Sequence, residues 1–292
     1  MATPDQPAGS PPVFICGRYQ LALNRPLIMG IVNVTPDSFS GDGLLQPTGA
    51  TPTQQAIAAA ERLAHEGADL LDIGGESTRP GAAPVSEQQE IDRIGPVLEL
   101  ALRLGLPISV DTRRPAVMRA VIAQGADLIN DVSGFRDPQA IDAVCASHCG
   151  LCIMHMQGEP ATMQADPVYQ DVVSEVESFL LAQRQQLLNR GVMRERILID
   201  PGFGFGKTLH HNLQLMRAIA QFARHQPVLV GVSRKRMIGA LTGQDVASER
   251  VSGSVAAALW AAAQGASVLR VHDVGPTRQA LSVWAALESR DE

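Results

Sequence analysis

The sequence has few of the features that mark secreted, membrane-bound or nucleic-acid-binding proteins. Four cysteines in 292 residues are too few for a disulfide scaffold, which predicts reduced thiols and a cytoplasmic protein. The longest apolar run, residues 255–263, is far shorter than the roughly 20 residues that cross a bilayer, and residues 1–13 lack the pattern of an export signal. With 24 basic and 30 acidic residues, the net charge of −6 excludes an overall attraction to nucleic acid or anionic lipid.

Three of the cysteines lie close together in the sequence and leave a zinc site open as an alternative. Cys145 and Cys149 stand four residues apart in a predicted helical stretch, whereas Cys152 falls within an apolar strand, and His148 and His155 are nearby. This spacing matches structural zinc sites poorly. Small buried thiols are therefore the favoured interpretation.

Short runs with strand character alternate with helical patterns along the whole chain, as in βα units around a parallel sheet. The predicted strands are residues 27–34, 70–74, 107–110, 128–131, 151–155, 197–200, 227–232 and 268–272. The predicted helices are residues 53–66, 87–104, 115–124, 138–148, 169–190, 209–222, 249–264 and 277–288. Eight such units predict a single α/β domain over residues 14–292, a (β/α)8 TIM barrel, after a disordered leader at residues 1–13.

The alternative to a barrel is an open, doubly wound sheet. That fold would carry a G-x-G-x-x-G turn after the first strand, but the sequence there reads NVTPDSFSGDG. Long loops follow the first and second strands, at residues 35–52 and 76–86, and we expect them to be mobile loops over an active site. Helix signals support the units: Thr53 and Ser86 are candidate starts, and helix ends are marked by Gly67, Gly105, Gly125 and Gly265.

Polar residues lie at or beside the carboxyl end of nearly every predicted strand. They are Asn33, Asp72, Asp111, Asn130, Asp131, His155, Asp200, Ser233, Arg234, Lys235, Arg270 and His272. Any one of these could simply cap the next helix. In a barrel, however, all strand ends meet at one mouth, where catalysis takes place. The carboxylates and amide among them suit a nitrogen-rich heterocycle, and the cations near the last strand suit a phosphate or diphosphate.

Three other motifs have less weight. GFGFGKT at Gly202 is similar to a phosphate loop, but Pro201 stands where that motif needs glycine, so the glycines are expected to allow close backbone approach instead. SRKR at Ser233 is interpreted as part of the site because it directly follows a buried strand. His210 and His211 begin a predicted helix and are expected on an exposed face.

Long segments of the chain resemble the dihydropteroate synthases of bacterial folate synthesis, from about residue 26 to residue 286. The segments are MGIVNVTPDSFSGDG, GADLLDIGGESTRPGA, PISVDT, LINDVSG, IMHMQG, IDPGFGFGKT, VGVSRKRMIG and RVHDV, in the order of the family. One departure is SGDG at Ser40, where the family more often has SDGG. The departure concerns the shape of the first loop.

The resemblance implies condensation of 6-hydroxymethyl-7,8-dihydropterin diphosphate with 4-aminobenzoate, which gives 7,8-dihydropteroate and pyrophosphate. The pterin would be held by Asp111, Asn130, Met154, Asp200, Phe205, Gly231 and Lys235. The diphosphate would be held by Asn33, Arg270 and His272, with Mg2+ at Asn33. The 4-aminobenzoate side would be formed by Phe39, Thr78, Arg79, Pro80 and Ser233. The residues implied to be catalytic are Asp111, Asp200, Lys235, Arg270 and His272.

The resemblance also implies a homodimer and a target of sulfonamides, and residues 249–286 offer apolar helices for a dimer face. The chemistry agrees with a dissociative reaction, because fixed cations and a metal would meet the charge of the leaving diphosphate. Three alternatives stay open at this point. They are a pterin-binding methyltransferase with a corrinoid partner, a catalytically silent pterin-binding paralogue, and a phosphate-binding barrel isomerase or aldolase.

Overall fold

A parallel barrel forms the centre of the protein, in a computed structural model that describes residues 12–34, 50–76, 85–159 and 162–288. Eight strands pair in the order β8-β7-β6-β5-β4-β3-β10-β9. A parallel bridge between Ile199 and Val228 joins the two ends of this order, so the predicted eight-stranded barrel is confirmed. The strands are β3 (Leu27–Asn33), β4 (Leu70–Gly74), β5 (Ile108–Asp111), β6 (Leu128–Asp131), β7 (Gly150–Met154), β8 (Ile197–Asp200), β9 (Leu229–Val230) and β10 (Val268–Val271).

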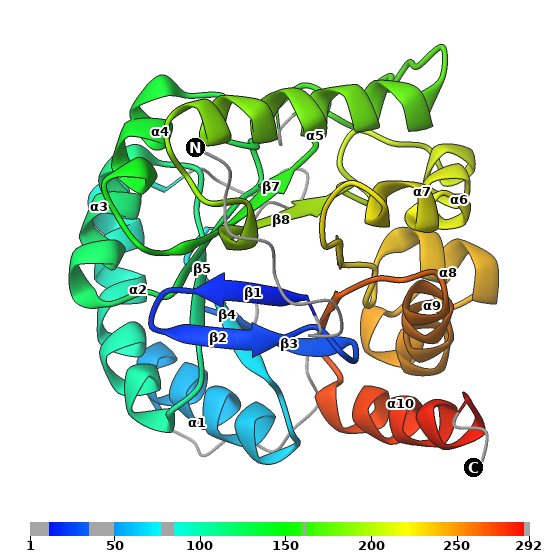
Figure 1. Cartoon of the computed structure of the whole chain (residues 1–292). Coiled ribbons are helices and arrows are strands. Elements are labelled where there is room, and N and C mark those ends of the chain that lie inside the picture. Colours follow the sequence, from blue (N-terminus) through cyan, green and yellow to red (C-terminus); the bar gives the residue numbers. More distant parts are fainter. Residues whose placement is uncertain (1–11, 35–49, 77–84, 160–161, 289–292) are drawn as a thin grey trace.

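Helices surround this barrel and alternate with its strands (Figure 1). They are α1 (Pro52–His65), α2 (Glu87–Ala101), α3 (Pro115–Gln124), α4 (Pro138–Cys145), α5 (Val172–Asn189), α6 (Leu209–Arg217), α7 (Ile219–Ala223), α8 (Arg236–Thr242), α9 (Val251–Ala263) and α10 (Val274–Glu288). Short 3-10 helices in the described part of the chain are η2 (Leu102–Leu104), η3 (Arg194–Arg196) and η4 (Ala247–Arg250). Within the ranges given above, no helix is both long and apolar enough to cross a membrane.

The structure corrects one predicted helix and adds a helix that was not predicted. The helix predicted over residues 209–222 is interrupted at Ala218, which ends α6 and precedes α7. Helix α8 was not predicted. It follows the SRKR segment and has only seven residues, too few for a recognisable apolar period.

The helix ends follow local hydrogen-bonding signals. Ser86 caps α2 as predicted: its hydroxyl accepts from the Gln89 backbone, and the Gln89 side chain bonds back to the Ser86 backbone. The prediction of Thr53 as a start was wrong, because Thr51 caps α1 and Pro52 takes the first helical position, where it needs no partner for a backbone N–H. The glycines predicted at helix ends do adopt left-handed backbone, with φ of +94°, +73°, +109° and +90° at Gly67, Gly105, Gly125 and Gly265.

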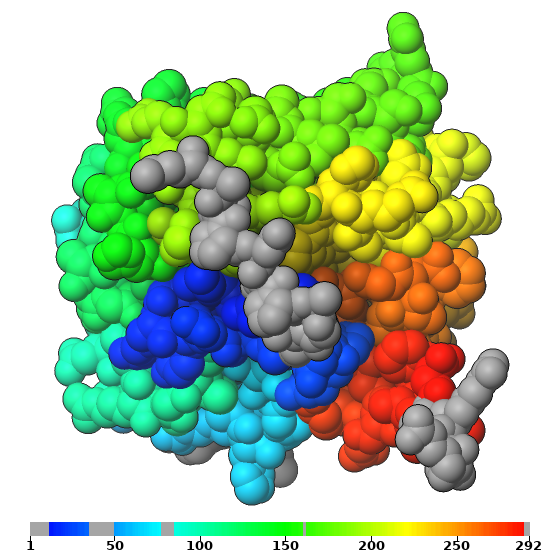
Figure 2. Space-filling model, in the orientation of Figure 1, coloured from blue at the N-terminus to red at the C-terminus, as the bar shows by residue number. Residues whose placement is uncertain are grey.

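A short hairpin that the sequence did not predict closes the amino-terminal end of the barrel. It pairs β1 (Val13–Cys16) with β2 (Tyr19–Ala22), so β1 begins at the last residue of the predicted leader. Its buried Phe14 and Cys16 pack against the lower interior residues of the barrel strands. Figure 2 shows the hairpin in dark blue across the centre of this face.

The barrel interior changes from apolar to polar along the strands. Residues two positions apart on a strand face the same side. An apolar layer beside the hairpin is therefore followed by a polar layer one step nearer the carboxyl ends. The successive pairs are Leu70 and Asp72, Leu128 and Asn130, Leu198 and Asp200, and Val268 and Arg270. The fold thus gathers polar groups in the upper half of the barrel.

Candidate active site

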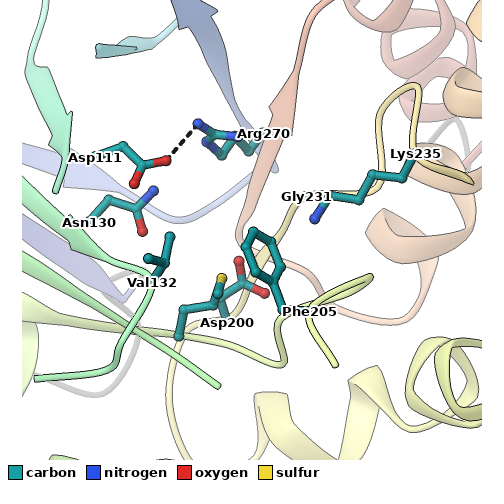
Figure 3. Close-up of a pocket in the computed structure, with 9 residues that line it drawn as sticks. Asp111, Asn130, Val132, Asp200, Phe205, Gly231, Lys235 and Arg270 are labelled. Carbon is teal, nitrogen blue, oxygen red and sulfur yellow. Dashed lines mark hydrogen bonds and ion pairs between the residues drawn. The ribbon is translucent and has the colours of Figure 1, made fainter. Parts of the chain in front are cut away.

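A pocket of about 260 Å³ lies among these polar groups, at the carboxyl ends of the strands (Figure 3). Its lining is Asp111, Asn130, Val132, Met154, Asp200, Phe205, Gly231, Lys235 and Arg270. Every residue expected around the pterin is in this set, together with Arg270 from the expected diphosphate group. Val132 was not predicted; its position directly after the β6 strand end is the signal that could have found it.

One side of the pocket is a network centred on Arg270. Its Nε donates to Oδ2 of Asp72 at 2.6 Å, and its Nη2 donates to Oδ2 of Asp111 at 3.1 Å. Asn130 also donates through Nδ2 to Oδ2 of Asp72, at 3.3 Å. The guanidinium is thus held by carboxylates from two neighbouring strands, β4 and β5, which are separated from its own strand β10 by β3.

Burial gives this network unusual acid–base properties. Desolvation raises the pKa of Asp111 to about 7, although the charge of Arg270 opposes the rise. Desolvation also disfavours the charge of Arg270, but Asp72 and Asp111 outweigh that effect and raise the Arg270 pKa. A carboxyl that titrates near neutral pH beside a permanent cation is typical of functional sites.

The opposite side of the pocket combines Asp200, Phe205 and Lys235. Oδ1 of Asp200 accepts from the Gly202 backbone at 2.7 Å. Nζ of Lys235 donates to the Phe203 carbonyl at 2.5 Å and lies 4.7 Å from the centre of the Phe205 ring. Burial lowers the Lys235 pKa to about 8, with Asp200 acting against the shift, and burial raises the pKa of Asp200.

The glycine-rich segment after β8 makes this side possible. Gly202 has φ +72°, and a Cβ there would lie 1.8 Å from the His155 carbonyl oxygen, so only glycine allows the close approach that was expected. The buried Lys207 fastens the segment: its Nζ donates to the carbonyls of Gly202, Phe205 and His155 at 2.9, 3.0 and 3.2 Å. Lys207 was not predicted, because the sequence offered only the resemblance of GFGFGKT to a phosphate loop.

His155 and Asp131 are among the strand-end residues that do not line the pocket. His155 is buried below the glycine-rich segment, where burial first and then Lys207 lower its pKa to about 2, and its Nδ1 lies 3.0 Å from Nζ of Lys207. Asp131 points to the loop that follows β6 and accepts from the backbones of Ser133 and Phe135, both at 2.7 Å. Both residues shape the segments that carry pocket residues.

The remaining predicted residues form a second group around β3, β9 and β10. The Ser233 hydroxyl accepts from the His272 backbone N–H at 3.1 Å and lies 3.1 Å from Nδ1 of His272. Asn33 is opposite Gly74, which is itself opposite Asp111. A Cβ at Gly74 would lie 3.9 Å from Oδ1 of Asn33 and 3.8 Å from Cβ of Asp111, so glycine keeps the space between these two side chains open.

Some predictions fall outside the ranges that the structure describes. Four residues expected on the aminobenzoate side lie outside these ranges; they are Phe39, Thr78, Arg79 and Pro80. Most of each long loop also lies outside them.

The cysteines and the paired histidines take structural places. Cys152 is fully buried inside the barrel and Cys149 is also buried, and burial raises the pKa of both thiols. Among the described residues, no three His, Cys, Asp or Glu side chains are grouped so that they could hold a metal ion. His211 completes the cap of α6 with Thr208, and His210 is exposed beside it.

Comparison with known proteins agrees with the geometry of this pocket. The profile of the pterin-binding enzyme family matches residues 29–272. The dihydropteroate synthase of Neisseria meningitidis serogroup B is 50% identical over 281 residues, which cover 94% of this chain and 97% of that protein. The structure of Xanthomonas albilineans dihydropteroate synthase with 4-aminobenzoic acid superposes with a TM-score of 0.89 at 49% identity, over 96% of this chain and all (100%) of that one. Burkholderia cenocepacia dihydropteroate synthase complexed with 7,8-dihydropteroate has a TM-score of 0.86 at 50% identity, over 96% and 97% of the two chains.

Proposed function

The chain belongs to the dihydropteroate synthases of the pterin-binding enzyme family, and from this premise we propose how its residues carry out the synthesis. The reaction joins 4-aminobenzoate to 6-hydroxymethyl-7,8-dihydropterin diphosphate and releases 7,8-dihydropteroate and pyrophosphate. A match over nearly the whole length of known synthases favours this activity over a corrinoid-linked methyltransferase or a silent paralogue.

The pterin ring occupies the pocket between Asp111 and Phe205. The observation that carries this assignment is the convergence of two carboxylates and one amide, Asp111, Asp200 and Asn130, on one small hollow with apolar walls. A pterin presents several N–H groups on a flat ring, and such groups need acceptors in its plane. Met154 and Phe205 supply the apolar contact on its faces, and Gly231 leaves space for the ring.

The diphosphate lies toward β3 and β10. Arg270 is the permanent cation at that edge of the pocket, and its guanidinium presents a fork of donors that matches phosphate oxygens. His272 follows it on the same strand end, held against Ser233 at 3.1 Å. Asn33 completes the group from β3.

Mg2+ would be held beside the diphosphate by Asn33. The donor set fits this ion, because Mg2+ usually takes one or two protein oxygens and completes its shell with substrate phosphates and water, without a dedicated protein cage. The Asn33 side-chain oxygen faces the space that Gly74 keeps open toward Asp111. When bound, the ion would neutralise negative charge on the departing pyrophosphate.

Bond cleavage is dissociative in this scheme. Loss of pyrophosphate leaves a cationic pterin methylene, and the carboxylates of Asp111 and Asp200 stabilise its positive charge at close range. Lys235 donates to the pterin from the opposite side. The arylamine is neutral and nucleophilic at neutral pH, so its attack requires no strong base.

The 4-aminobenzoate side remains an assignment from family resemblance. Ser233 precedes the pocket residue Lys235 by two positions in the chain and is 5% exposed. The other residues assigned to this side are Phe39, Thr78, Arg79 and Pro80.

The proposal also covers the oligomeric state and the cellular compartment. We propose one barrel domain over residues 14–292 in a homodimer within the cytoplasm. Apolar side chains on α8, α9 and α10 support the dimer: Leu241, Trp260 and Val283 are 54%, 50% and 62% exposed. Exposed large apolar groups on neighbouring elements mark interaction surfaces.

The test is pyrophosphate release by purified protein given dihydropterin diphosphate, Mg2+ and 4-aminobenzoate, with a control that lacks the arylamine. Stoichiometric pyrophosphate and dihydropteroate are expected in the complete mixture. Binding of the pterin without product would support the silent paralogue instead, and failure to bind it would refute the pocket assignment.

A further inference from the structure

The carboxylate of Asp72 lies in the centre of the barrel and has no assigned role. It is fully buried, on β4, in the same polar layer as Asn130 and Arg270, but it does not line the pocket. An isolated buried carboxylate is costly unless other groups hydrogen-bond to it. The bonds that Asp72 receives should therefore indicate why it is there.

Both hydrogen bonds are donated by residues that are assigned to substrate binding. Oδ2 of Asp72 accepts from Nε of Arg270 at 2.6 Å and from Nδ2 of Asn130 at 3.3 Å. Arg270 belongs to the diphosphate group and Asn130 to the pterin group. A single oxygen atom thus links a residue of the diphosphate group to a residue of the pterin group.

The bond to Arg270 fixes its guanidinium independently of the substrate. Arg270 also pairs with Asp111, but Asp111 is assigned to the pterin and would be shared with it on binding. Asp72 is 0% exposed and does not contact the substrate, so its hydrogen bond to Arg270 is not shared when the substrate binds. Its ion pair therefore keeps Arg270 in place whether or not the pocket is filled.

The bond to Asn130 sets the direction of its amide. A carboxylate oxygen only accepts hydrogen bonds, so the NH2 group of Asn130 must face Asp72 and the carbonyl oxygen must face away from it. Among the described residues, none donates to that carbonyl oxygen, Oδ1 of Asn130. Figure 3 shows this oxygen on the side of Asn130 that faces Asp200, across the pocket. A buried acceptor presented to the pocket suits an N–H of the bound ring.

We propose that Asp72 is a positioning residue that fixes the guanidinium of Arg270 for the diphosphate and the amide of Asn130 for the pterin. This inference rests on the proposed assignment of those two residues. Asp72 itself touches neither substrate. Its effect on turnover passes through the groups it holds.

The variant Asp72→Asn tests this role with little change in volume. An asparagine can turn its own NH2 group toward Arg270 or Asn130, so the direction of both groups is no longer imposed. Ser109→Ala is the matched control, because Ser109 is opposite Asp72 on β5, is equally buried, and has an unpaired hydroxyl within the described structure. If Asp72→Asn does not accumulate as folded protein, Asp72→Ser leaves room for a water that can accept from both donors.

Two binding titrations separate the two bonds. Inorganic pyrophosphate reports on Arg270, and 6-hydroxymethylpterin without a diphosphate reports on Asn130. We expect Asp72→Asn to weaken both ligands by about 10- to 100-fold, since small displacements of positioned groups have effects of that size. Ser109→Ala should leave both affinities unchanged.

The pH dependence of turnover gives a readout that a merely structural role would not move. Charged groups on several elements act on the Asp111 pKa; these are Arg270, which lowers it, and Asp72, Glu90 and Asp131, which raise it. Without the charge of Asp72, Asp111 should stay ionised to lower pH, so the acid limb of the kcat/KM profile, which reports the free protein, should move to lower pH in Asp72→Asn. Unchanged affinities together with an unmoved limb would overturn the inference.

A failure of the proposed role of Asp72 can be distinguished from a failure of the proposed function. If the wild-type protein forms no dihydropteroate, the proposed function fails, while the two titrations still decide whether Asp72 positions the binding groups. If the wild-type protein is active and Asp72→Asn binds both ligands equally well, only the role of Asp72 is refuted.

Discussion

The carboxylate of Asp111 should have opposite effects on turnover and on folding stability. It should promote turnover and lower the free energy of unfolding near pH 8. Its carboxylate faces the pterin in the proposed complex, where it stabilises the cation left by the departing diphosphate. In the free protein the same carboxyl is largely removed from water, and this burial raises its pKa to about 7. Replacement of Asp111 by Asn keeps the size of the side chain and removes the charge.

The pKa gives the size of the stability effect. The ordinary value is 3.8, so the folded protein binds a proton at Asp111 more tightly than the unfolded chain does. That contribution to stability is fully present below the unfolded pKa and is lost as the pH rises through about 7. At about 1.4 kcal/mol per pKa unit, ionisation costs the folded state up to about 4 kcal/mol at pH 8. Because the asparagine resembles the neutral carboxyl, Asp111→Asn should be more stable than wild type at about pH 8, by about 2–4 kcal/mol.

Turnover should fall in the same variant. The loss of one preorganised charge at the reacting centre typically lowers kcat by about 100- to 1,000-fold. The assay is pyrophosphate release at saturating substrates, combined with urea unfolding at pH 6 and pH 8 to obtain the free energy of unfolding. Asp142→Asn is the control, because it removes one carboxylate that is 61% exposed on the surface. Near wild-type turnover, or a variant less stable than wild type at pH 8, would refute the reasoning.

Four further outcomes can be checked. The kcat/KM of the wild-type protein should fall below a pH of about 7, where Asp111 takes up a proton, and above about 8, where Lys235 loses its charge; a flat profile would contradict both assignments. Arg270→Ala should weaken inhibition by pyrophosphate and slow the cleavage step, and unchanged pyrophosphate affinity would argue against its role. Gly202→Ala should lower the free energy of unfolding by more than about 3 kcal/mol, whereas Gly243→Ala, with almost the same φ of +71° but open space around it, should have a much smaller effect. Chelation of Mg2+ should abolish pyrophosphate release and its restoration should recover it; full activity in the chelator would refute the metal assignment.

Much of the barrel and of the pocket follows from the sequence because strand direction fixes where residues meet. Parallel strands place all their carboxyl ends together, so Asp111, Asn130 and Asp200 could be assigned to one site without knowledge of their contacts. The four glycines predicted at helix ends also have a local cause, since left-handed backbone excludes most other residues.

Other features depend on contacts that no local pattern encodes. The β1–β2 hairpin has only Phe14 and Cys16 as fully buried residues, and what they cover is the end of a barrel assembled from distant strands. Lys207 stood within an apparent phosphate-loop motif, and only the fold reveals that its ammonium is used by carbonyl groups of the protein itself. Asp72 looked like one more strand-end polar group, although it does not line the pocket and instead holds Arg270 and Asn130.

The division of the barrel into an apolar and a polar half explains how the folded protein tolerates buried polar atoms that have no hydrogen-bond partner. Oδ1 atoms of Asp72 and Asn130 have no partner in the described structure, and each unsatisfied buried polar atom costs about 1–3 kcal/mol. The lower half offsets this cost through close apolar packing, in which the buried Phe14 of the hairpin contacts the interior residues of the strands. The charged groups of the pocket therefore lie toward the carboxyl ends of the strands, at the end of the barrel opposite the hairpin. Since the electrostatic interactions of Asp111 and Arg270 are strongest where water is excluded, the apolar half contributes to the chemistry that the polar half performs.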